Sequence, residues 1–163
     1  MESKPKDKKA KQKKHYMKFF WMMLTSFVAM YFLMFINMDQ LNHFSITLTR
    51  IYMAICMISV MAIIMLLFML NMYKDKKMNI IILVGSVILF FGVLNMLRNQ
   101  IFISDVQWMR GMIPHHSSAI MTSNFSHLED EEAKKLAKEI IEAQKREIAE
   151  MRKIIYRLEN SED

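Results

Sequence analysis

A short stretch at residues 108–121 brings thioether and imidazole side chains together within a few helical turns. It contains Met109, Met112, His115 and His116. A helix turns by about 100° per residue. Counted from Met109, the side chains of Met112 and His116 therefore lie within about 40° of each other, on one face of the helix. Thioether sulfur and imidazole nitrogen are ligands that suit Cu(I). This face therefore predicts a site for a soft metal.

The two adjacent histidines differ in direction. On a straight helix His115 points about 100° away from His116, so the pair is a poor chelate for one metal. Pro114 precedes them and can re-aim one ring by kinking the helix or by starting it. The spacing therefore leaves two interpretations of His115 open, as a ligand or as a structural residue.

A second amphipathic helix is predicted at about residues 131–159. Its apolar stripe alternates spacings of four and three, which is typical of a packed helix: Ala133, Ala137, Ile140, Gln144, Ile148, Met151, Ile155 and Leu158. Within it, Gln144, Glu147 and Met151 form one patch at spacings i, i+3 and i+7. Facing Met112 and His116, that patch completes a mixed sulfur, nitrogen and oxygen environment.

The candidate metal ligands are therefore His116, His115, Met112, Met151 and Met109. Each methionine also fits a plain packing role, because a flexible thioether side chain fills gaps in helix contacts. His116 is the strongest candidate, since a buried imidazole needs a partner.

Two motifs in these segments resemble a known family. Met112-Ile-Pro-His-His116 is followed by Gln144-x-x-Glu-Ile-x-x-Met151, and together they resemble the family called domain of unknown function 305, over about residues 104–158. The resemblance implies a ferritin-like helical domain outside the cytoplasm and a copper-binding role. Many relatives carry Met where Thr122 stands, whereas the methionine here is Met121.

Three long apolar runs precede this part of the chain. Residues 19–38, 51–72 and 78–97 contain no charged side chain, and each is long enough for a hydrocarbon core of about 30 Å, which takes about 20 helical residues. We predict an all-α protein with a tail at 1–18, a three-span membrane anchor at 19–97 and a two-helix hairpin domain at 98–163. Ser104 is the expected cap of the first hairpin helix, which should run to about residue 125 and be interrupted or bent at Pro114.

The net charge of +6 is concentrated beside these runs. Eight lysines lie between positions 4 and 18, and three more lie at 74–77. Flanking lysines stay on the cytoplasmic side, which predicts a multi-pass protein of the plasma or inner membrane with its amino terminus in the cytoplasm. The loop at 39–50 and everything after residue 97 then lie outside the cytoplasm.

Residues 1–16 are expected to form a disordered arm that is able to touch anionic lipid. Nucleic acid is not an expected partner, because the arm lacks interleaved aromatic residues. In the outer loop, a solvated His43 is favoured over an accessory metal contact.

The second run carries methionine at every fourth position from Met53 to Met69. Steps of four advance about 40° each, so the row drifts by about 160° around the helix. This drift favours packing over a copper relay.

The predicted hairpin cannot cover its own apolar faces. A four-helix bundle completed by a second copy is the natural solution, so we predict a homo-oligomer, with the bilayer and copper donor or acceptor proteins as further partners.

The favoured function is a membrane-anchored copper-binding protein that sequesters the metal or hands it on, with copper as the bound ion. The alternative is a non-enzymatic oligomerising or stress-related membrane protein in which His and Met pack without metal. A di-iron oxidase is disfavoured, because its bundle needs Glu-x-x-His and the sequence contains none.

Overall fold

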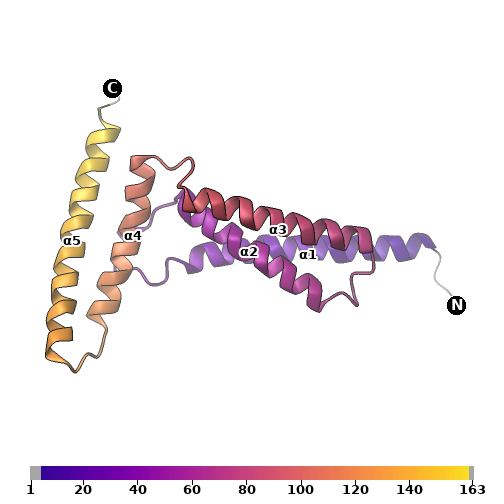
Figure 1. The fold of residues 1–163 in the computed structure, drawn as a ribbon, viewed down its shortest axis with the longest axis horizontal. Helices are drawn as coiled ribbons and strands as arrows, with labels where there is room; N and C mark the ends of the chain where they lie inside the picture. The colour runs from indigo at the N-terminus through magenta and orange to yellow at the C-terminus, as the bar shows by residue number, and fades with distance from the viewer. Residues whose placement is uncertain (1–4, 162–163) are drawn as a thin grey trace. The chain divides into compact units, whose positions relative to one another are not determined.

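The computed structural model describes residues 5–161, and within them the chain is all-α with no strand. The elements are α1 (Pro5–Leu33), the short 3-10 helix η1 (Leu41–His43), α2 (Leu48–Phe68), α3 (Lys76–Arg98), α4 (Asp105–Asn124) and α5 (Glu131–Glu159) (Figure 1). The predicted all-α class is confirmed, and α5 has the predicted bounds.

In the part of the chain that the structure describes, three helices are long and apolar enough to cross a membrane. They are Gln12–Leu33 within α1, Leu48–Phe68 and Lys76–Arg98. They overlap the three apolar runs at 19–38, 51–72 and 78–97, although the first helix ends at Leu33. An uncharged run of about 20 residues is long enough for the hydrocarbon core.

The predicted disordered arm is wrong for residues 5–16, since α1 begins at Pro5. Lysine and glutamine are good helix formers, and extending an existing helix avoids the cost of nucleating a new one. Residues 1–4 of that prediction lie outside the described residues.

The chain divides into two compact units. The first contains the chain up to Tyr31 together with Ile51–Ile101, and the second contains Phe32–Arg50 together with the chain from Phe102 onward. The segment between α1 and α2, residues 32–50, is called the α1–α2 segment below. Although the predicted boundaries place all of it within the anchor at 19–97, it packs in the unit that contains α4 and α5.

The first unit has a small core formed by Phe19, Ala62, Leu66 and Tyr73. Met65 and Met69 pack against this cluster, whereas Met53 and Met57, on the same helix, are exposed. The methionine row of α2 therefore turns away from one face, as its four-residue spacing predicts.

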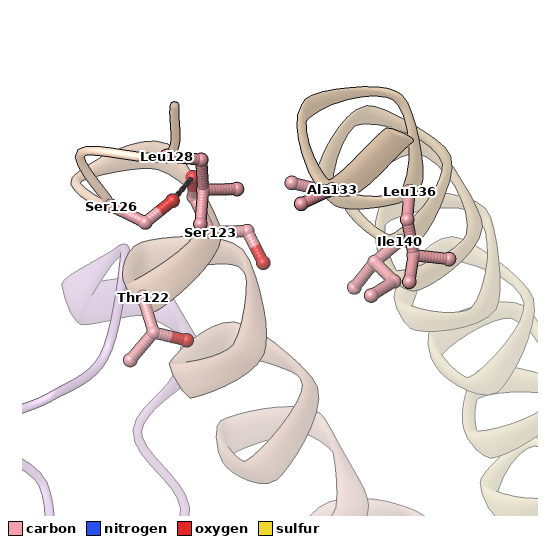
Figure 2. A pocket seen from close by; sticks show the side chains of 8 residues that line it. Thr122, Ser123, Ser126, Leu128, Ala133, Leu136 and Ile140 are labelled. Atoms are coloured by element: carbon pink, nitrogen blue, oxygen red, sulfur yellow. Dashed lines mark hydrogen bonds between the residues drawn. The ribbon is translucent and has the colours of Figure 1, made fainter. Parts of the chain in front are cut away.

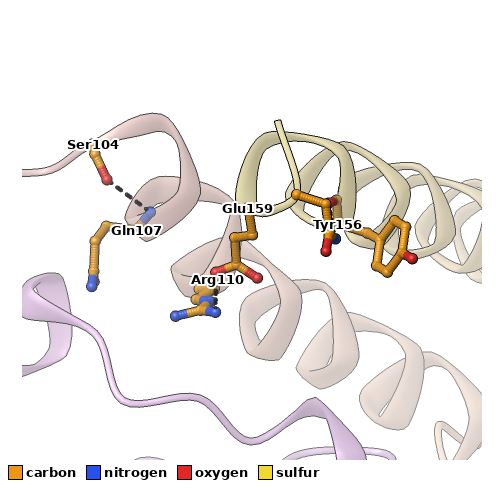
Figure 3. Close-up of polar contacts among 6 residues, drawn as sticks. Ser104, Gln107, Arg110, Tyr156 and Glu159 are labelled. Atoms are coloured by element: carbon orange, nitrogen blue, oxygen red, sulfur yellow. Dashed lines mark hydrogen bonds and ion pairs between the residues drawn. The ribbon is translucent and has the colours of Figure 1, made fainter. Parts of the chain in front are cut away.

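In the second unit, α4 and α5 form an antiparallel hairpin (Figure 1). Each helix begins at a capping side chain: Ser104 Oγ accepts from the Gln107 N–H at 3.4 Å (Figure 3), and the Asp130 carboxylate accepts from the Ala133 N–H at 2.8 Å. These bonds satisfy amide groups that a helix start leaves unpaired.

The hairpin core consists of Met109, Ile113, Ile120, Ile148 and Met151. Helix α4 continues through Pro114, so of the two predicted outcomes, an interruption or a bend, the interruption does not occur. Pro114 is fully buried, and packing around it holds the helix together despite the lost hydrogen bond. Arg110 and Glu159 form an ion pair between α4 and the end of α5 (Figure 3).

Candidate functional site

His116 on α4 is buried, with 9% of its surface exposed, and both its ring nitrogens have partners. Nδ1 lies 2.9 Å from the Met112 carbonyl oxygen, one helical turn earlier. Nε2 lies 2.8 Å from Glu147 Oε2 on α5. A carbonyl and an ionised carboxylate only accept hydrogen bonds, so each ring nitrogen that carries a proton can donate it to the partner beside it. The contact also confirms that the Glu147 patch faces His116.

The same register brings two methionines opposite each other. Met112 lies four residues before His116 on α4, and Met151 lies four residues after Glu147 on α5. Because the two helices are antiparallel, one turn along each keeps the pair in step. Met151 and Met109 are buried in the hairpin core, and Met112 packs against it. We call the group Met109, Met112, His116, Glu147 and Met151 the seam.

His115 does not join the seam. Its side chain is exposed, and the centroid of its ring is 6.1 Å from that of His116. The continuous helix through Pro114 keeps the two rings pointing in different directions, as a straight helix requires. Gln144, the remaining member of the predicted patch, is half-buried on α5.

The seam combines thioether sulfur atoms with one imidazole and one carboxylate. Within residues 5–161, no group of three or more His, Cys, Asp and Glu side chains is arranged to hold a metal ion. A metal at the seam would therefore need thioether ligands in addition to His116. Such a set suits Cu(I) better than zinc or iron, which favour nitrogen, oxygen or thiolate ligands. To bind there, a metal would have to take Nε2 from Glu147 and release its proton.

The residue after His116 makes a second polar contact that the sequence did not predict. Ser117 is fully buried, and its Oγ lies 2.7 Å from Nδ1 of His43 in the α1–α2 segment. The same oxygen accepts from the Asp39 N–H at 2.8 Å. His43 is 5% exposed, so the prediction of a solvated loop histidine is wrong. The segment lacks any periodic pattern from which this packing could be inferred.

Further bonds fasten the α1–α2 segment to both hairpin helices. Asn37 Nδ2 donates to Ser118 Oγ at 2.6 Å, and the Ser45 hydroxyl donates to the Arg110 carbonyl. From α5, Arg152 donates to the Asn42 carbonyl at 3.0 Å. These bonds, at separated points along α4 and on α5, make the segment an integral part of the second unit.

Burial lowers the pKa of His43 from its usual value, and the positive charge of Arg152 lowers it further, while the negative charge of Asp39 partly offsets both effects. A serine hydroxyl on a histidine nitrogen is also the arrangement of an activated nucleophile. Ser117, however, has no exposed surface, so a substrate cannot reach its oxygen. The pair is therefore a structural contact.

A groove lies at the turn of the hairpin, between the end of α4 and the start of α5 (Figure 2). Its volume is about 320 Å³, and apolar side chains including Leu128, Leu136 and Ile140 line it. None of the five predicted metal ligands lines this groove.

The chain belongs to the family described as domain of unknown function (DUF305), whose model matches residues 94–161. It is also 33% identical over 138 residues to the uncharacterized protein L153 of Acanthamoeba polyphaga mimivirus, an alignment that covers 82% of this chain and 88% of that protein. This likeness is longer than the family segment, so it includes part of the candidate membrane helices. No solved structure matches the chain significantly.

Proposed function

We propose that this chain is a membrane-anchored, non-enzymatic copper-binding protein whose hairpin unit lies outside the cytoplasm and sequesters Cu(I) or hands it on. The observation that carries the proposal is the seam, where His116 and Glu147 are in contact and Met112 packs against the core cluster that contains Met151. Thioether sulfur and imidazole nitrogen together favour Cu(I) over harder ions.

In this proposal the seam residues have distinct roles. His116 supplies Nε2 as a ligand, while the Met112 carbonyl holds Nδ1 and orients the ring. Met112 and Met151 supply sulfur, with Met109 as the next thioether along α4. Glu147 competes for Nε2 until the metal arrives and takes up a position beside the site afterwards. His115 is exposed and is assigned to the route of entry or to a partner protein.

The proposed orientation rests on charge and on chain connectivity. Lys74, Lys76 and Lys77 lie at the α2–α3 turn, and lysines flanking spans favour the cytoplasmic side. If all three candidate spans cross the membrane, the α1–α2 segment and everything after α3 emerge on the same side. The packing of that segment in the same unit as the hairpin supports this arrangement.

Copper binding is tested on the full chain in detergent, because the second unit includes residues 32–50. Cu(I) affinity is measured by competition with a chromophoric chelator. We expect one ion per chain, with binding weakened at least about tenfold in His116→Ala and in the double variant Met112→Leu/Met151→Leu, since a lost ligand costs at least about 1.4 kcal/mol. Met57→Leu, on the exposed side of α2, is the matched control and should bind like the parent.

Failure of the chain to bind Cu(I), or equal binding by all four proteins, would refute the proposal. Orientation is tested separately with a membrane-impermeant maleimide on intact cells, in a Cys56→Ser background. Ser161→Cys should be labelled and Lys74→Cys should not.

A second candidate function is a metal-free, oligomerising membrane protein. It is favoured by the complete pairing of His116 within the chain and by the burial of Met109 and Met151 in the hairpin core. In either case we propose a homo-oligomer, because the hairpin exposes Trp108, Leu136 and Tyr156. Light scattering of the purified chain distinguishes a monomer from an oligomer, with and without copper.

A further inference from the structure

The contact between His43 and Ser117 is satisfied differently by the neutral and the protonated histidine ring. The Ser117 oxygen accepts the Asp39 N–H, and its single hydroxyl proton is then available for Nδ1 of His43, 2.7 Å away. In the neutral tautomer that carries its proton on Nε2, Nδ1 accepts this hydroxyl proton, and all three polar groups then have a partner. The neutral form of His43 therefore satisfies the contact completely.

Protonation of His43 would place two donors against one oxygen. The Asp39 N–H and the new Nδ1–H would both point at Ser117 Oγ, and the hydroxyl proton would lose its acceptor. Ser117 has no exposed surface and His43 is 5% exposed, so water is poorly placed to replace the lost bond. A buried group left without a partner favours opening of the structure around it.

The charges around His43 do not stabilise an imidazolium well. Arg152 on α5 repels it, Asp39 in its own segment attracts it, and α4 contributes the uncharged Ser117. No carboxylate oxygen makes a hydrogen bond to His43 among the described residues, in contrast to the Glu147 partner of His116.

We infer that His43 and Ser117 form an acid-sensitive latch, which holds the α1–α2 segment on the hairpin when His43 is neutral and releases it when His43 is protonated. The latch controls the one segment that joins α1 and α2 directly while packing on α4 and α5. It acts whether or not the seam binds a metal.

The test follows the Asp39 amide, whose N–H donates directly to Ser117. Hydrogen exchange is measured by mass spectrometry on the full chain in nanodiscs at pH 7.5, 6.5 and 5.5, with labelling times corrected for intrinsic exchange. Peptides covering residues 36–47 should exchange about tenfold faster at pH 5.5 than at pH 7.5 after correction. Peptides from residues 140–155 of α5 should stay protected, which shows that the hairpin remains folded.

Two variants separate His43 from other histidines. His43→Asn keeps an acceptor near the position of Nδ1 but does not titrate, so its segment should stay protected at all three pH values. His127→Asn, at the exposed hairpin turn, is the matched control and should open like the parent. Ser117→Ala should exchange rapidly at every pH.

Unchanged protection of the parent between pH 7.5 and 5.5 would overturn the latch, and so would equal acid opening in His43→Asn. If residues 36–47 of His43→Asn already exchange rapidly at pH 7.5, the latch is tested instead by NMR titration of the His43 ring in the parent. Its midpoint must coincide with the loss of Asp39 protection, and separate midpoints would overturn the proposal.

Discussion

Two consecutive residues of α4 face two different surroundings in the second unit. His116 faces α5, where Glu147 accepts from its ring, and Ser117 faces the α1–α2 segment, where His43 contacts its hydroxyl. Both regions hold a buried histidine, but one ring meets a carboxylate and the other a hydroxyl with Arg152 nearby. The same side chain therefore has an acidic partner in the seam, whereas at the segment its burial and Arg152 lower the pKa of His43.

The largest loss of stability should come from removing the Ser117 hydroxyl, which bonds both Asp39 and His43 of the α1–α2 segment. Ser117→Ala leaves the part-buried Asp39 N–H and the buried His43 ring without their partner, and an unsatisfied buried group costs about 1–3 kcal/mol. Thermal unfolding of the full chain in detergent should show this loss. Ser118→Ala, which removes one bond to Asn37 at a half-buried position, should cost about 1 kcal/mol or less. Equal effects of the two substitutions would show that Ser117 has no special role.

A smaller effect should appear when pH is varied. Because the pKa of folded His43 is lowered, the unfolded chain binds its proton more readily than the folded chain does. The stability that neutral His43 contributes is thus present above its usual pKa of about 6.5 and is lost as pH falls through the lower folded value. Unfolding temperatures measured between pH 7.5 and 5 should fall less in His43→Asn than in the parent. Parallel curves for the two proteins would contradict the assignment.

The seam should respond to the loss of its acid partner more weakly. Glu147→Ala removes the acceptor at Nε2 of His116, but the Glu147 side chain is 44% exposed, so water can replace the carboxylate. We expect a loss of about 1 kcal/mol, observed as a small drop in the unfolding temperature without copper. With Cu(I), the same variant should not lose affinity if Glu147 only competes for Nε2. A large loss would instead make Glu147 a ligand.

The smallest effect is expected at the ion pair between Arg110 and Glu159. Both side chains are more than a third exposed, and such pairs contribute about 0–1 kcal/mol. Glu159→Gln should shift the unfolding temperature only slightly, and that small shift should vanish at high salt. A salt-independent shift would mean that packing, rather than charge, determines the contribution of this pair.

The local and periodic features of this molecule could be predicted from the sequence. The apolar runs predicted the three candidate spans, and apolar residues spaced alternately by four and three predicted α5. Ser104, as a helix cap, predicted the start of α4. The facing of His116 and Glu147 followed from helix periodicity. These features depend on residues that are neighbours in sequence or share a helix face.

The α1–α2 segment could not be predicted in the same way. Ser117 lies 74 residues from His43 along the chain, and the residues that meet it belong to no helix stripe. The prediction of a disordered arm at residues 5–16 failed for another reason, because composition alone cannot tell a lysine-rich coil from the lysine-rich end of a long helix. In both cases tertiary or neighbouring structure decided the outcome.

The discontinuous make-up of the second unit imposes an order on its biosynthesis. Its first piece, Phe32–Arg50, leaves the ribosome before α2 and α3 are made, and the surface that receives it is completed only with α5. Thr47, which is almost fully covered in the finished protein, lies beside Gly111 of α4, which is made only after α2 and α3. A fragment that starts after α3 would likewise lack residues 32–50, which belong to the same compact unit as α4 and α5.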